Sequence, residues 1–177
     1  MDDDGLMQRA AGGDTQAFGL IVYAYQSRLV RFAIRLSGDS DLAQDAVQEA
    51  FLRLWRVRVA YQPRGCLQAY LFRVVRSVCL DQARSRRLWE VLDENGAAEA
   101  SGPETLAVGK GLAEAVQIAV QALPEAQRTV FILSQYEALT YAEIAEVLDC
   151  PLGTVASRKH QATETLRRKL QLWKDPT

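Results

Sequence analysis

The chain has 177 residues, of which 49% are hydrophobic and 24% are charged, so it has enough apolar residues for a folded core and is not disordered throughout. Its formal net charge is only −1 at pH 7, which excludes the strongly basic class of protein that binds DNA tightly by charge alone. No apolar run approaches the roughly 20 residues of a membrane span, and the start MDDDGLMQ is acidic where a secretory signal would be basic, so we expect a cytoplasmic protein.

The charges are unevenly distributed along the chain. Residues 1–88 carry 13 Lys and Arg against 9 Asp and Glu, residues 89–125 carry 1 against 7, and residues 126–177 carry 7 against 6. Two slightly basic ends therefore flank an acidic middle. This pattern is typical of lobes that have separate partners.

Three cysteines are present, and their number and spacing exclude two common uses. Cys66, Cys79 and Cys150 are odd in number, far apart and never part of a CxxC pair. Neither a disulfide framework nor a zinc site is indicated. We expect buried or unreactive thiols, and no metal or other cofactor.

Apolar periodicity predicts helices nearly throughout and no strands. The expected helices span residues 4–11, 14–36, 41–59, 68–87, 109–122, 125–136, 141–148 and 151–172. Between them, Leu88 to Gly109 is rich in Gly, Ala, Ser, Pro and acids, which is the composition of a mobile tether. The prediction is an all-α chain with one small helical bundle in residues 1–88, a flexible linker in 89–109 and a second bundle in 110–177.

The helix at 41–59 has an unusual outward face. Its inner side is apolar and comprises Ala43, Val47, Ala50, Phe51 and Leu54. Its outer side comprises Asp45, Glu49, Leu52 and Arg56, flanked by Gln48 and Trp55. An exposed Leu beside carboxylates and a Trp favours a protein-binding surface, although an ordinary solvated face remains the alternative.

The segment 61–87 combines arginines with an aromatic residue. Its inward positions are apolar and comprise Leu71, Val75, Val78 and Cys79. Its outward positions are Tyr70, Arg73, Ser77 and Arg84, with Arg76 and Arg87 nearby. Such a face suits a single nucleic-acid strand, because arginines follow the phosphates and the aromatic ring stacks on a base. The preceding Pro/Gly loop, residues 62–66, has the composition to enclose a base drawn out of its stack.

Near the C-terminus, local signals predict a helix-turn-helix. Thr140 and Glu143 form a capping box, so a short helix starts there. Pro151 ends that helix near Asp149 and suits the first turn of the next one. A short helix, a turn and a longer helix in this order match the DNA-binding arrangement.

The second helix of this pair has two distinct faces. We assign Leu152, Val155, Ala162, Leu166 and Leu170 to the inner face, and Ser157, His160, Gln161 and Glu164 to the outer face. The outer face fits base edges in a major groove, with Arg158 and Lys159 at its flanks for phosphates. A solvated face of an ordinary helical hairpin is the alternative. Because His160 is the one His in the chain, it indicates a surface or DNA contact and not a His-based metal site.

Five ordered blocks carry a family resemblance over nearly the whole chain: GDTQAF (13–18), DLAQDAVQEAFLRLW (41–55), AYLFRVVRSVCLDQAR (69–84), ALPEAQRTVFIL (122–133) and LTYAEIAEVLDCPLGTVASR (139–158). The chain resembles a bacterial RNA polymerase sigma factor of the small extracytoplasmic-function (ECF) group. The resemblance implies a region 2 domain and a region 4 domain. It further implies core RNA polymerase and promoter DNA as partners and transcription initiation as the role.

The resemblance also implies residue roles. Region 2 docks on the clamp helices of the polymerase β′ subunit, here through Asp45, Gln48, Glu49, Phe51, Leu52 and Trp55. It reads and opens the minus-10 element, here through Pro63, Arg64, Gly65, Cys66, Gln68, Tyr70, Arg73, Arg76, Ser77 and Arg84. Region 4 reads the minus-35 element as duplex, here through Arg128, Thr154, Ser157, Arg158, Lys159, His160 and Gln161.

Further partners follow from the same resemblance. The acidic linker would run into the polymerase, which makes the β subunit a further contact. Members of the group are usually held inactive by an anti-sigma factor, often membrane-tethered. The chain departs from the family pattern at three positions, since members usually carry Trp at Tyr70, Asn at Ser77 and often Arg at Gln161. We therefore expect altered base selection.

Two other classes of function are alternatives to a sigma factor: a DNA-binding regulator and an enzyme. A helix-turn-helix repressor or activator, with an N-terminal dimerisation or sensing bundle, would bind operator DNA without polymerase. An enzyme is disfavoured because the sequence has no GxGxxG or GxxxxGK[ST] loop, no metal-ligand cluster and no nucleophile beside a plausible base. We accordingly expect no catalytic residues and no small-molecule substrate.

Overall fold

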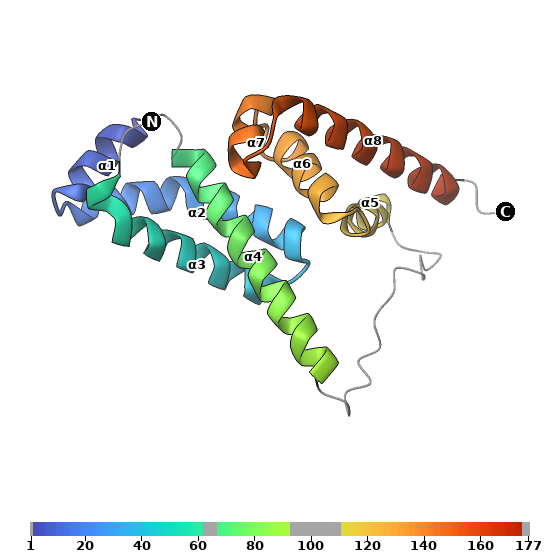
Figure 1. Cartoon of the computed structure of the whole chain (residues 1–177), viewed down its shortest axis with the longest axis horizontal. Coiled ribbons are helices and arrows are strands. Elements are labelled where there is room, and N and C mark those ends of the chain that lie inside the picture. The colour runs from blue at the N-terminus through green and yellow to red at the C-terminus, as the bar shows by residue number, and fades with distance from the viewer. Residues whose placement is uncertain (1, 62–66, 93–110, 175–177) are drawn as a thin grey trace. The chain divides into compact units, whose positions relative to one another are not determined.

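A computed structural model describes residues 2–61, 67–92 and 111–174, and within these ranges every regular element is helical (Figure 1). The elements are α1 (Asp3–Ala11), α2 (Thr15–Ser37), α3 (Ser40–Val57), a short 3-10 turn η1 (Arg58–Ala60), α4 (Leu67–Leu92), α5 (Leu112–Gln121), α6 (Glu125–Gln135), α7 (Tyr141–Leu148) and α8 (Leu152–Lys174). The all-α prediction is confirmed. Within the described ranges, no helix is both long enough and apolar enough to cross a bilayer.

The largest difference from the predicted elements lies at the end of α4. This helix continues to Leu92, beyond the position where we expected the tether to begin. Residues 89–92 read WEVL and contain no helix-breaking Gly or Pro, and the first glycine of the segment is Gly96. The helix can therefore continue through these four residues. The remainder of the expected linker lies outside the described residues.

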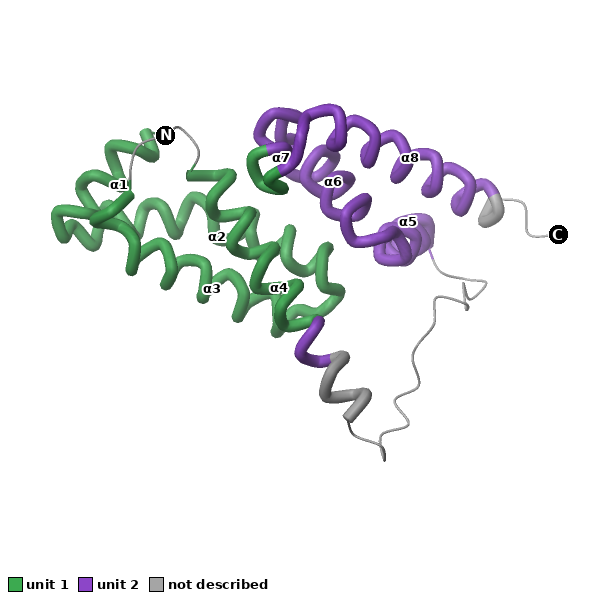
Figure 2. Tube along the Cα trace, in the orientation of Figure 1, with its two compact units in different colours: residues 1–83, 146–149 green, residues 84–145, 150–177 purple. Residues whose placement is uncertain are grey.

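Backbone contacts divide the chain into two compact units (Figure 2). The first unit comprises residues 1–83 together with 146–149, and the second comprises residues 84–145 and 150–177.

Aspartates start the first three helices of unit 1. Asp2 accepts a hydrogen bond from the backbone of Gly5, and Asp39 accepts two, from the N–H groups of residues 41 and 42. Asp14 accepts from the N–H groups of residues 16 and 17 and bonds Arg9 at 2.8 Å. The Ala17 N–H bond, followed by Arg9, holds the pKa of Asp14 below its usual value. These caps satisfy amides that the first turns leave unpaired and so define where each helix begins.

The core of unit 1 is formed by one face each of α1, α2, α3 and α4. Phe32 of α2 and Phe72 of α4 meet edge to face at 5.1 Å between ring centroids. The largest fully buried side chains around them are Met7, Ile21, Leu29, Leu54, Leu67, Leu71 and Val75. Cys79 is 3% exposed, and burial raises the pKa of its thiol to about 11, so this cysteine is the unreactive kind that we expected.

In unit 2, α8 packs against α5 and α6. The expected inner residues Val155, Ala162 and Leu166 are buried, whereas Leu152 is 55% exposed and our assignment of it to the inner face is wrong. Leu152 is the first residue of α8. Because a helical side chain leans toward the N-terminus of its helix, Leu152 points back over the preceding turn and away from the core.

Two tyrosines attach α1 to the rest of unit 1. The Tyr25 hydroxyl donates to Asp3 Oδ2, and the Tyr61 hydroxyl donates to Asp4 Oδ1 at 3.1 Å. Tyr25 is 7% exposed, and its burial, together with the Asp3 carboxylate, raises the pKa of its phenol well above the usual value. The phenol therefore stays protonated and remains a donor.

We predict that Tyr25→Phe lowers the free energy of unfolding by about 1–3 kcal/mol, because the half-buried Asp3 carboxylate loses its donor. Chemical denaturation followed by circular dichroism measures this. Tyr23→Phe is the matched control, since Tyr23 lies on the same helix and is 86% exposed. Equal effects of the two substitutions would contradict the role given to the hydrogen bond.

Candidate functional sites

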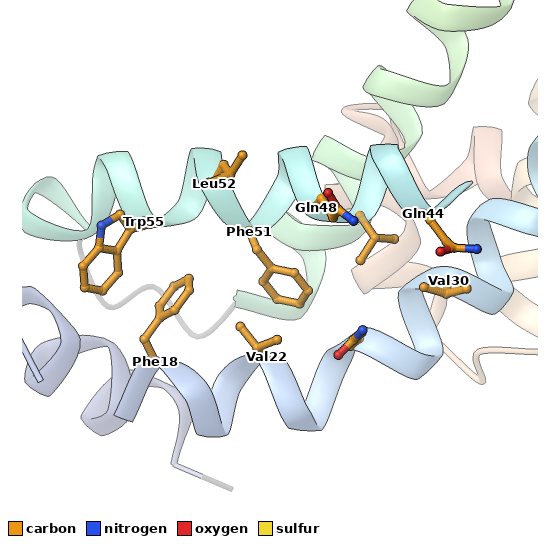
Figure 3. A pocket seen from close by; sticks show the side chains of 10 residues that line it. Phe18, Val22, Val30, Gln44, Gln48, Phe51, Leu52 and Trp55 are labelled. Atoms are coloured by element: carbon orange, nitrogen blue, oxygen red, sulfur yellow. The ribbon is translucent and has the colours of Figure 1, made fainter. Parts of the chain in front are cut away.

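A groove with a volume of about 400 Å³ runs between α2 and α3 (Figure 3). It is lined mainly by apolar and amide side chains, four from α2 and six from α3: Phe18, Val22, Gln26, Val30, Gln44, Val47, Gln48, Phe51, Leu52 and Trp55. In Figure 3, Phe18 and Val22 of α2 face Phe51 and Trp55 of α3. The groove is thus built from both helices and opens on the surface of unit 1.

Aromatic contacts hold one end of the groove. The Phe18 ring lies 4.9 Å from the Trp55 ring and 6.5 Å from the Phe51 ring, both edge to face. The Arg58 guanidinium lies 3.9 Å from the centroid of the Trp55 ring, which is cation–π distance. Because Phe18 and Arg58 both pack on it, the half-buried indole has little freedom to rotate, so this end is a preformed apolar surface.

The residues expected to bind a protein partner are brought together on α3. Asp45, Gln48 and Leu52 are exposed, with Leu52 at 51%, whereas Phe51 is buried at 8% exposure and forms part of the groove wall. The contribution of α2 was missed from the sequence. Its signal was the spacing of four residues between Phe18 and Val22, which continues to residues 26 and 30.

Helix α3 also carries a charged cluster outside the groove lining. Glu49 Oε1 accepts from Arg53 Nε at 2.8 Å, and Arg56 Nη1 lies 3.8 Å from the same oxygen. The hydrogen bond from Arg53, followed by the charges of both arginines, lowers the pKa of Glu49. Glu49 is therefore ionised at neutral pH and forms an ion pair on the same helix as the groove residues Gln48 and Leu52.

On α4, helical periodicity places four of the expected DNA-binding residues on one face: Tyr70, Arg73, Ser77 and Arg84. Arg73, Ser77 and Arg84 are exposed, and Tyr70 and Arg76 are half-buried. Burial raises the pKa of Tyr70, so its phenol is neutral at physiological pH. The expected contacts Pro63, Arg64, Gly65 and Cys66 lie outside the described residues.

Gln68, at the start of α4, is held by α2. Arg28 Nη1 donates to Gln68 Oε1 at 3.0 Å, and the Arg28 guanidinium lies 5.6 Å from the centroid of the Phe72 ring. This half-buried amide is therefore fixed against the body of unit 1. Arg28 belongs to α2 and contacts the start of α4 through Gln68. The sequence analysis did not single it out.

The expected helix-turn-helix is present in α7 and α8. The Thr140 N–H donates to Glu143 Oε2 at 2.7 Å and the Glu143 N–H donates to Thr140 Oγ1 at 3.3 Å, which confirms the capping box. The turn closes with the Cys150 N–H donating to the Ala145 carbonyl at 3.1 Å and with Asp149 in the left-handed region, φ 49°. This is the hydrogen-bond pattern of a helix C-terminus that reverses the chain within two residues.

The start of α8 presents a polar outer face. Ser157, His160 and Gln161 are exposed, and Thr154 is half-buried. Arg158, also half-buried, lies with its Nη1 3.9 Å from Cys150 Sγ in the preceding turn. The outer face therefore has the donors and small side chains that base reading requires.

Two of the cations expected at phosphates make contacts within unit 2. Lys159 Nζ lies 2.6 Å from Ser134 Oγ and 4.9 Å from the centroid of the Phe131 ring, and burial lowers the pKa of this lysine. Lys159 follows buried Val155 by four residues, so it lies along the seam with α6 and not at the outer flank. Arg128 Nη1 bonds the Gln121 carbonyl and Gln121 Oε1, both at 2.9 Å, which joins α6 to the end of α5.

Among the described side chains, no group of three or more His, Cys, Asp and Glu residues is arranged to hold a metal ion.

Comparisons with known proteins bear on both units. Residues 21–88 match the model of sigma-70 region 2, and residues 113–166 match that of sigma-70, region 4. The chain is 30% identical to the RNA polymerase sigma-H factor of Pseudomonas aeruginosa, over 96% of this chain and 94% of that protein. It is 31% identical to the ECF RNA polymerase sigma-E factor of Escherichia coli K12, over 97% of this chain and 95% of that protein.

A solved structure agrees with these matches. The sigma factor RpoE of Bartonella quintana, crystallised with the anti-sigma factor NepR, has a TM-score of 0.73 and 25% sequence identity. The match covers 88% of this chain and 97% of that one. With region 2 and region 4 matched in order and relatives aligned over nearly their full length, the chain belongs to the sigma-70 family, in its ECF group.

Proposed function

We propose that this protein binds core RNA polymerase through the α2–α3 groove and gives the polymerase its promoter specificity. The observation that carries the proposal is the groove itself, which combines exposed Leu52 with a fixed aromatic end. The ion pair of Glu49 and Arg53 lies on the same helix, and apolar residues with polar residues around them are the usual composition of a protein interface. The partner surface in the polymerase is the β′ clamp helices, with the β subunit as a second contact.

The exposed face of α4 supports a role in opening the minus-10 element. Unstacking a base costs a few kcal/mol, and stacking it on an aromatic side chain returns about 1–3 kcal/mol. Tyr70 provides the neutral ring, and Arg73 and Arg84 lie on the same helix to neutralise phosphates. Binding energy on this face therefore favours the opened strand over the duplex.

The outer face of α8 supports reading of the minus-35 element as duplex. A recognition helix contacts base edges with the residues of its N-terminal half, and Ser157, His160 and Gln161 occupy that position here. When one unit has bound its promoter element, the other unit is held near its own element at a raised effective concentration. Specificity then requires both elements, and the protein performs no chemistry of its own.

Control by an anti-sigma factor is part of the proposal. The similar RpoE of Bartonella quintana was crystallised with such an inhibitor. An inhibitor with an apolar helix would fit the groove and exclude polymerase by occupying the same side chains. We place the protein in the cytoplasm, where polymerase works, with the inhibitor tethered at the membrane.

We predict that Leu52→Ala weakens binding to core polymerase at least about fivefold, because an exposed side chain in the groove is removed without a cavity in the core. Binding and promoter-specific run-off transcription measure this. Leu20→Ala is the matched control, because Leu20 is 50% exposed on α2 and does not line the groove. Equal losses from both substitutions, or a shift of palindromic DNA by the protein alone at physiological salt, would contradict docking at the groove.

Tyr70→Ala should leave polymerase binding intact and slow formation of the open promoter complex, because the stacking surface is lost. Permanganate reactivity of unpaired thymines in the minus-10 element measures opening over time. Tyr23→Ala serves as the control for loss of an exposed aromatic ring. A normal opening rate with Tyr70→Ala would remove Tyr70 from the mechanism.

Lys159→Met should leave the salt dependence of promoter binding by the holoenzyme unchanged, because the Lys159 ammonium is engaged with Ser134 and Phe131 of α6. Arg158→Met should reduce the slope of log K against log salt by about 1, the effect of one lost phosphate contact. The comparison is made on one promoter over a series of salt concentrations. A reduced slope for Lys159→Met would restore this residue to the DNA interface.

A further inference from the structure

Two glutamines meet at the edge of the candidate DNA-reading face of unit 2. Gln127 Nε2, on α6, donates to Gln161 Oε1, on α8, at 3.2 Å. Gln161 is exposed and Gln127 is half-buried. An amide offers a donor at one end and an acceptor at the other, so this contact fixes which end of Gln161 faces outward.

Burial determines which amide donates and which accepts in the hydrogen bond between Gln127 and Gln161. Gln127 Oε1 is the inner atom of its amide, and it is buried without a hydrogen-bond partner among the described residues. With the amide reversed, the buried group would be an NH₂ with two unpaired donors. Buried N–H groups without partners are rarer than carbonyls without partners, so the observed orientation is the favoured one.

We infer that Gln127 is a positioning residue that orients Gln161 to present N–H donors to the promoter duplex. With Oε1 of Gln161 turned toward α6, its Nε2 is the atom directed away from the contact. In the major groove, guanine and thymine present acceptors, adenine presents one acceptor and one donor, and cytosine presents only a donor. The base that Gln161 contacts is therefore selected for an acceptor and against cytosine.

This inference rests on the proposed function, because it assigns the chemistry of one position in the minus-35 element. It concerns hydrogen-bond direction and not affinity. Substitution of Gln127 should therefore change which base is preferred, in addition to any effect on overall transcription.

Gln127→Glu is the most direct test, because it keeps the shape of the side chain and leaves only acceptors. A carboxylate beside Gln161 draws the Gln161 NH₂ inward and turns Oε1 outward. The preferred base at that position should move toward cytosine, the one base with a lone donor. Gln127→Met, which removes the donor without adding an acceptor, should flatten the preference and change no other position.

The experiment is run-off transcription by the holoenzyme on templates randomised across the minus-35 element. Gln161→Ala first identifies the position, as the one where the wild-type preference falls by about fivefold or more. Gln135→Glu is the matched control, because it adds the same charge at an exposed position of α6. In the Gln161→Ala background, Gln127→Glu should cause no further change of preference.

Two results would overturn the inference while leaving the proposed function in place. One is promoter-specific transcription in which Gln127→Glu leaves every base preference as in the wild type. The other is a change caused equally by Gln135→Glu, which would indicate a general effect of charge. Failure of the wild-type protein to direct any promoter-specific transcription would instead contradict the proposed function and overturn this inference with it.

Discussion

The width of the apolar stripe on α2 is the constraint on which unit 1 depends. One row of this helix, at residues 17, 21, 25 and 29, is buried and builds the core. The adjacent row, at residues 18, 22, 26 and 30, lines the groove with α3. A helix that only needed to cover a small core would carry one such row. The second row leaves Phe18, Val22 and Val30 only half-buried within unit 1, and we propose that polymerase covers this surface.

In unit 2, the packing of the helices leaves the outer face of α8 exposed to solvent. The start of α8 is fixed by the closed turn at Asp149 and by packing on α5 and α6. Lys159 and Arg128 contribute to that packing, so the charges that remain on the outer face are few. Weak charge and fixed geometry suit a module that reads bases while another part of the complex provides most of the affinity.

The helices and the helix-turn-helix could be predicted from the sequence because their causes are local. Thr140 with Glu143 starts α7, and Pro151 separates α7 from α8. The exposure of Leu52 could also be predicted, since it follows from helical periodicity alone. In these cases the conformation and exposure of each side chain are determined by residues within one or two turns of the same helix.

The features that the sequence did not predict depend on contacts between helices, and helical periodicity does not predict such contacts. Helical periodicity places Lys159 one turn after buried Val155, but only the packing shows that Ser134 and Phe131 of α6 contact its ammonium. The groove required α2 as well as α3, and only their packing shows that Phe18 faces Trp55. Gln127 carried no signal at all in the sequence, because its role arises from a single contact across two helices.

Photo-crosslinking in the assembled holoenzyme tests the central claim most directly, because it reports which surface meets polymerase without loss of any contact. A photo-reactive phenylalanine analogue is placed either at Leu52 in the groove or at Tyr23 on the exposed side of α2. We predict that the probe at position 52 crosslinks to the β′ subunit and that the probe at position 23 does not. A crosslink to β′ from position 23 with none from position 52 would contradict the account.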